Sequence, residues 1–258
     1  MTEWIIMKRL HSIFSVILSI TLISMVSSSY AEPTSAVGRV VWVKGSFTAT
    51  GTDKPARDLK KLSIIYLKDT LKTENNSQAQ IVFTDNTMMT FKPNSKLSID
   101  QYAFSPPTKK KTISKYIVSL IEGGFRTITG LIAKSNPKNY QVNTPVATIG
   151  VRGTDYAVYL DNKGELFIGG YSGIPCVSNP SGGLCLSKDT KFANVSSGNK
   201  APIPLTQQPA GFANKLEIVP AKIAYTSSPT SPTSPSSPSS SAPQSKTPGS
   251  SNSFCIVQ

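Results

Sequence analysis

The chain has 258 residues, which is enough to bury one sizeable core, and 38% of them are hydrophobic. Its 27 basic and 14 acidic residues give a formal net charge of +13. Such a surface favours polyanions, namely acidic polysaccharide, lipid headgroups or nucleic acid, although the same charge can serve solubility alone. The one histidine, His11, lies in a segment that we expect to be removed, which excludes serine triads, Cys–His dyads and histidine zinc sites from the mature protein.

Residues 1–31 have the pattern of a secretory signal peptide. Lys8 and Arg9 form a basic start, and residues 13–26 are apolar apart from Ser and Thr. Ser29-Tyr30-Ala31 then places small residues at the positions that a signal peptidase reads. The alternative is an uncleaved membrane anchor, but the run is short for a span of about 20 apolar residues. We therefore expect cleavage after Ala31 and a periplasmic or secreted protein.

Short strands follow one another in the first part of the mature chain. The pattern predicts strands at residues 37–43, 79–83 and 88–91, with a turn at Asp85-Asn86, where both residue types tolerate left-handed geometry. Leu97 and Ile99 alternate with polar residues in the next strand. We expect an all-β fold, a single domain of many short strands in a roll, sandwich or stacked arrangement. This domain spans residues 32–225, with its core at 37–160.

Residues 105–111 interrupt the strands with two prolines and a basic triplet, which predicts an exposed loop. The triplet is either a solvated run or a binding patch and consists of Lys109, Lys110 and Lys111. A strand pair at residues 116–120 and 122–126 should follow. Residues 128–132 suit either a short helix or a strand.

The most informative segment is residues 144–156. β-branched residues flank Gly150 and Gly153, which predicts a strand, a tight glycine corner and a second strand. Each glycine would take positive φ or let another backbone come close. Arg152 can hold a carboxylate or a phosphate. The alternative, which we favour, is that it satisfies backbone carbonyls or Asp155 at the corner.

This segment resembles the FecR domain, whose most recognisable stretch reads T-P-x-A-x-x-x-x-R-G-T-x-[FY]. The resemblance runs from about residue 37 to about residue 159, and a further segment, ending in Arg126, resembles L-x-x-G-x-[VAF]-[RW]. Lys68 and Asn86 stand where the family usually has glycine. The motif residues are Thr144, Pro145, Gly150, Gly153, Thr154, Asp155 and Tyr156, with Ala147 and Arg152 also in place.

Residues 164–170 suit a hairpin arm and residues 192–204 a closing strand, with an apparent loop insertion between them. Cys176 and Cys185 lie in that Gly/Pro/Ser-rich insertion, and in an oxidising envelope they should form a disulfide; the alternative is two reduced thiols. We expect no metal site and no cofactor.

The tail, residues 226–258, is rich in Ser, Pro and Thr and should be disordered. It ends in Cys255-Ile256-Val257-Gln258, which matches a prenylation signal, but we favour a short apolar end with a free thiol.

Two functions fit these features. The first is a non-enzymatic envelope module whose partner is an envelope protein or an acidic cell-wall glycan, bound through Arg152 or the lysine triplet. The second is implied by the resemblance: a signalling component like the FecR anti-sigma regulators of iron uptake, which couple an outer-membrane receptor to an anti-sigma function. Those regulators carry a cytoplasmic segment and a transmembrane helix before the β domain, whereas here we expect only a signal peptide. We expect no nucleic-acid partner, membrane contact only before the leader is cleaved, and no enzymatic activity.

Overall fold

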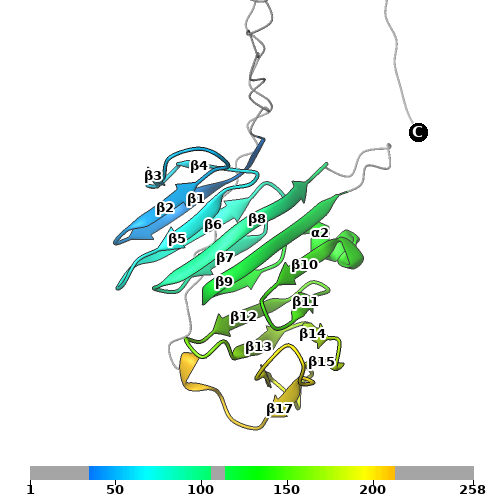
Figure 1. Ribbon diagram of the computed structural model, residues 1–258. Helices are drawn as coiled ribbons and strands as arrows, with labels where there is room; N and C mark the ends of the chain where they lie inside the picture. The colour runs from blue at the N-terminus through cyan, green and yellow to red at the C-terminus, as the bar shows by residue number, and fades with distance from the viewer. Residues whose placement is uncertain (1–34, 106–113, 213–258) are drawn as a thin grey trace, which may run out of the picture. The chain divides into compact units, whose positions relative to one another are not determined.

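The computed structural model describes residues 35–105 and 114–212 of the chain, all of them within one unit of the fold. The predicted all-β class is confirmed, because strands dominate and the helices are short (Figure 1). The helices are α2 (Leu131–Ser135), η1 (Pro137–Asn139) and η2 (Ala210–Phe212). The strands are β1 (Ala36–Lys44), β2 (Phe47–Thr50), β3 (Arg57–Asp58), β4 (Ile64–Tyr66), β5 (Thr70–Thr73), β6 (Gln78–Phe83), β7 (Met88–Phe91), β8 (Ser95–Ala103), β9 (Lys115–Ile128), β10 (Tyr140–Asn143), β11 (Thr148–Gly150), β12 (Asp155–Leu160), β13 (Leu166–Ser172), β14 (Cys176–Asn179), β15 (Gly182–Cys185), β16 (Phe192–Val195) and β17 (Ile203–Leu205).

The strands form two sheets that share β9. The first sheet has the order β4-β1-β6-β7-β9-β12-β13-β16-β17. The second has the order β3-β2-β5-β8-β9-β10-β11-β14-β15. Neighbours are antiparallel except β9 and β10, which run parallel. In Figure 1, β9 separates the blue and cyan strands from the yellow-green ones.

The expected strand pair at residues 116–126 is wrong, because β9 is one continuous strand. Its first half pairs with β8 and β10, and its second half pairs with β7 and β12. The crossing between sheets lies at Gly123, where φ is +71° and a Cβ would come within 2.3 Å of the Asn94 carbonyl oxygen. Only glycine fits such a position. Gly123 therefore bends the strand without ending it, although the sequence suggested that the strand ends there.

Apolar side chains of the two sheets form one contiguous core. Leu97 and Ile99 are buried, as their alternation predicted, and five of the six residues of β6 are buried. Three buried tyrosines, Tyr116, Tyr140 and Tyr156, also belong to this core. The rings of Tyr116 and Tyr140 stack with centroids 4.4 Å apart, and the Tyr140 hydroxyl lies 3.1 Å from the Tyr156 hydroxyl. Burial raises the pKa of all three phenols.

Asp85 fixes the β6–β7 turn to α2. Asn86 has φ +71°, which confirms a left-handed turn at Asp85-Asn86. The Asp85 carboxylate is buried and accepts hydrogen bonds from the Thr87 amide (3.0 Å), the Thr87 hydroxyl (2.9 Å) and the Ile132 amide (3.2 Å). Burial raises the pKa of Asp85, although these hydrogen bonds oppose the shift. The helix alternative for residues 128–132 is therefore realised from Leu131 onward.

The C-terminal half consists of hairpins. The predicted hairpin arm is β13, which returns along β12. The expected loop insertion is wrong, because its residues form the β14–β15 hairpin, in which Cys176 lies opposite Cys185 and is joined to it by a disulfide. The expected single closing strand is also two antiparallel strands, β16 and β17.

The predicted leader, the triplet Lys109–Lys111 and the tail all lie outside the described residues. Within residues 35–105 and 114–212, no helix has the length and apolar character needed to cross a membrane.

Candidate functional site

The glycine corner carries the chain from one sheet to the other. β11 ends at Gly150 in the second sheet, and β12 begins at Asp155 in the first. Two hydrogen bonds with Thr129 fix the corner. The Thr129 hydroxyl accepts a hydrogen bond from the Thr154 amide at 2.8 Å, and the Thr129 amide donates to the Thr154 carbonyl at 3.0 Å. Gly153 has φ +61°, as predicted. The corner is therefore a fixed platform rather than a loose turn.

Gly150 does not have the role that its sequence suggested. Its φ is not positive, and a Cβ placed on it would meet nothing within 4 Å. The reason is its place at the end of β11, where extended backbone suits any residue.

Most other residues of the motif build the fold. The Thr144 hydroxyl accepts the Ala147 amide proton (3.0 Å) and donates to the Ala147 carbonyl (2.8 Å), which closes the turn that Pro145 begins. Tyr156 is buried and reaches the hydroxyl of Tyr140. Each of these side chains has a structural task that explains its presence.

Arg152 differs from them, and the favoured interpretation of it is wrong. Its side chain is exposed and forms no hydrogen bond or ion pair with any residue described at 35–105 or 114–212. Asp155 is instead held by Arg126, with Nε to Oδ1 at 2.9 Å and an Nη to Oδ2 at 2.6 Å. The Arg126 guanidinium also lies 5.0 Å from the ring centroid of Tyr171. Arg126 stands at the last position of the second family segment, which was the signal for it.

Two further residues belong to segments that pack on Gly153, the residue after Arg152. A Cβ on Gly153 would lie 3.7 Å from the stem of Lys134, which is itself exposed and unpaired among the described residues. Gly173 packs against Gly153 and Thr154, and Ile174, next in the chain, is 56% exposed. The corner thus carries the guanidinium of Arg152, unpaired among the described residues, while the segments that pack on Gly153 contribute a second cation and an exposed apolar residue.

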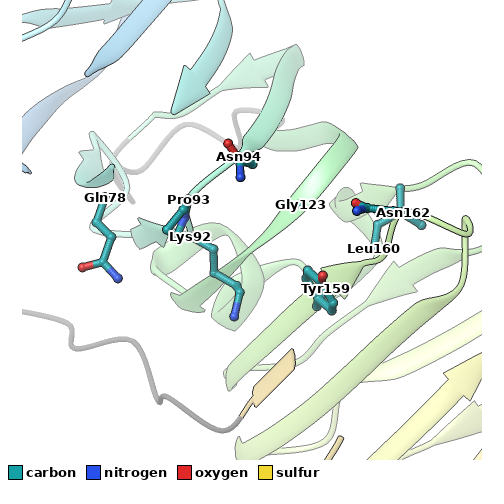
Figure 2. A pocket seen from close by; sticks show the side chains of 8 residues that line it. All are labelled: Gln78, Lys92, Pro93, Asn94, Gly123, Tyr159, Leu160 and Asn162. Atoms are coloured by element: carbon teal, nitrogen blue, oxygen red, sulfur yellow. The ribbon is translucent and has the colours of Figure 1, made fainter. Parts of the chain in front are cut away.

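A cleft of about 390 Å³ lies at the other end of β12 (Figure 2). Its walls come from the start of β6, the β7–β8 connection, the bend of β9 and the end of β12. The lining residues are Gln78, Lys92, Pro93, Asn94, Gly123, Tyr159, Leu160 and Asn162.

Lys92 is the charged residue of this cleft. Its ammonium lies 5.2 Å from the ring centroid of Tyr159 and donates to the carbonyl of Gly211 at 2.5 Å. Partial burial lowers the pKa of Lys92. Sequence reasoning missed this site, because a lysine next to a turn proline looks solvated and Gly211 lies 119 residues away.

The family model described as FecR protein matches residues 69–168. No curated protein matches the chain. Two crystal structures of a candidate anti-sigma factor from Parabacteroides distasonis are similar, at 15% identity with a TM-score of 0.41 and at 13% identity with a TM-score of 0.39. Each alignment covers 53% of this chain and 58% of that protein, so the chain spans little more than half the length of these structures.

The matched residues contain both sites described above. The motif that forms the corner and every residue that lines the cleft fall between positions 69 and 168. The sequence motif and the family match agree, and the resemblance to the FecR domain is confirmed for residues 69–168 of this chain.

Proposed function

We propose that this FecR domain is a regulatory module without catalytic activity, which works in the cell envelope by binding a protein through the corner at Arg152. The observation that supports it is the contrast within the motif. The side chains of Thr144, Asp155 and Tyr156 are hydrogen-bonded within the fold, whereas Arg152 is exposed and unpaired among the described residues. A motif residue without a structural task is best explained by a contact to another molecule.

The chemistry of the corner suits a protein partner that presents a carboxylate. A guanidinium can bind a carboxylate with two parallel hydrogen bonds, and the fixed backbone at Gly153 and Thr154 reduces the entropy that is lost on binding. The exposed side chain of Ile174 would supply apolar contact beside the charge. In this proposal the domain takes part in signalling, as the resemblance to FecR regulators suggests, and an acidic side chain of an envelope protein is the ligand of Arg152.

The test uses the native cells and the full-length gene. Transcript levels are compared between the wild type and a deletion strain, with and without iron limitation, and the promoters that respond define the readout. The deletion strain is then complemented with the wild-type gene, Arg152→Glu, Arg152→Lys or Lys163→Glu, the last changing an exposed lysine in the β12–β13 turn. Equal amounts of each folded variant are verified by immunoblot and thermal melting.

We expect Arg152→Glu to reproduce the deletion, Arg152→Lys to act in part, and Lys163→Glu to act as the wild type. A deletion that changes no transcript in either condition would refute the regulatory role. Full complementation by Arg152→Glu would refute the role of the corner.

A further inference from the structure

We infer that the cleft around Lys92 is a binding site for a carboxylated sugar, such as a uronic-acid unit of an acidic polysaccharide. This site goes beyond the protein-binding function proposed for the corner. Figure 2 shows Lys92 reaching from the β7–β8 connection, with Tyr159, Leu160 and Asn162 contributed from the end of β12.

The first argument is the charge of Lys92. Its ammonium is partly buried, and no described carboxylate lies within ion-pair distance of it. The Gly211 carbonyl and the ring of Tyr159 are its neighbours, and neither carries a full negative charge. An ammonium has three donors, so at least one remains for a ligand. A partly desolvated cation without a counter-ion favours an anion in the adjacent space.

The second argument is the set of polar groups around the lysine. The side chains of Gln78, Asn94 and Asn162 line the cleft, and none forms a hydrogen bond with any side chain or backbone group in the described part of the protein. Each amide offers donors and an acceptor, which is what neighbouring hydroxyl groups of a sugar require. One cation together with three amides therefore matches a ligand with a single carboxylate and several hydroxyls.

The third argument is size and position. A volume of about 390 Å³ lies within the usual range for small-ligand sites, about 300–1,000 Å³. The cleft and the corner lie at opposite ends of β12, whose six residues span about 20 Å at about 3.3 Å per residue. A ligand in the cleft would therefore not touch Arg152. The full chain carries a net charge of +13, which would attract a polyanion to the protein as a whole.

The structure also provides a matched control. A second hollow of about 460 Å³ lies on the outer face of the second sheet and contains Lys68 and Lys96 among three threonines, one serine and Ile121. Lys96 resembles Lys92 in being partly exposed and free of ion pairs with described residues, but no aromatic ring or amide side chain lines its hollow.

The experiment titrates the exported protein with galacturonate oligosaccharides by calorimetry, and with neutral galactose oligosaccharides and short polyglutamate as comparison ligands. We expect saturable binding of the galacturonates, at least tenfold weaker binding to Lys92→Met, and less than a twofold change for Lys96→Met. Arg152→Glu should bind as the wild type, so the outcome is separate from that of the corner.

Three results would overturn the inference. Galacturonates that do not saturate the wild-type protein exclude the site. Equal losses in Lys92→Met and Lys96→Met indicate attraction by general charge. Polyglutamate binding as tightly as the sugar at Lys92 identifies a peptide carboxylate as the ligand class. A thermal melt of each variant verifies that the fold is retained.

Discussion

The ion pair between Arg126 and Asp155 should be a main determinant of stability, whereas Arg152 should contribute little. Both side chains of the pair are largely buried, with 11% and 18% of their surfaces exposed. Asp155→Asn removes the charge while keeping the shape of the side chain, and it leaves the guanidinium of Arg126 without its counter-ion. Arg152→Ala removes an exposed side chain that has no partner among the described residues.

The size of the effect follows from the geometry. The two hydrogen bonds of 2.9 and 2.6 Å are charge-assisted, and each contributes about 1.5–3 kcal/mol. Breaking a buried pair on one side costs about 3–5 kcal/mol, and the residual exposure places this pair near the lower end. We expect Asp155→Asn to lower the free energy of unfolding by about 3 kcal/mol, which lowers Tm by about 6–12 °C. Arg152→Ala should stay within about 0.5 kcal/mol of the wild type.

Urea denaturation measures these differences, with the fluorescence of Trp42 as the signal. Trp42 lies in β1, and its indole Nε1 donates to the Gln80 side chain at 3.0 Å, so unfolding should change its environment. The double variant Asp155→Asn/Arg126→Met should lose much less than the sum of the single losses, since one change already breaks the pair. The reasoning fails if Asp155→Asn costs less than about 1 kcal/mol, or if Arg152→Ala costs as much as Asp155→Asn.

Other consequences concern backbone geometry and the buried phenols. Lys68 has φ +69°, so Lys68→Gly should raise the free energy of unfolding by about 0.5 kcal/mol, whereas Lys68→Ala, which keeps the strain, should not. Gly153→Val should lower thermal stability by about 1–2 kcal/mol because of its φ of +61°, and Gly150→Val should be nearly neutral; equal losses would contradict the assignment. Tyr116→Phe should be neutral or stabilising in urea titrations, because the hydroxyl of Tyr116 is buried with no partner in the described residues, while Tyr140→Phe, which breaks a hydroxyl pair, should cost about 1 kcal/mol. The pKa values of these phenols are raised in the folded protein, so the neutral phenols stabilise the fold fully below about pH 10, and this stabilisation is lost as the pH rises further. The urea midpoint should therefore fall above about pH 10, and ionisation of the phenols should not change it at lower pH.

The distribution of apolar residues made part of the fold predictable from the sequence. β6 and β7 stand where short apolar runs placed them, and nearly all of their residues are buried, whereas β8 stands where a period-two pattern placed it. β2 to β5 were not identified as strands, since each has only two to four residues and all but β4 consist largely of Thr and charged residues. β9 was divided in two because a pair of glycines normally ends a strand, and only its pairing with four other strands reveals that it continues.

The candidate site was predictable to the same limited degree. The motif identified the corner and the positive φ of Gly153, because these are local properties of a short segment. The sequence suggested Arg152 as the partner of Asp155 because the two residues are close in sequence, and this was wrong. The actual partner, Arg126, lies 29 residues away and is brought next to Asp155 by the pairing of β9 with β12. The contact between Lys92 and Gly211 depends on packing over a still longer interval, for which no local pattern exists.

The ion pair between Arg57 and Asp69 limits how a gene for this domain can be shortened. The family match begins at Asp69, yet that carboxylate is buried and is held by the guanidinium of Arg57, which lies outside the match. A gene trimmed to the matched segment would also delete β1, which is the antiparallel neighbour of the buried strand β6 in the sheet. The product would carry an unpaired carboxylate and an open strand edge that recruits other chains. The unit of sequence similarity is thus smaller than the unit of folding, and expression of the β domain should begin before β1.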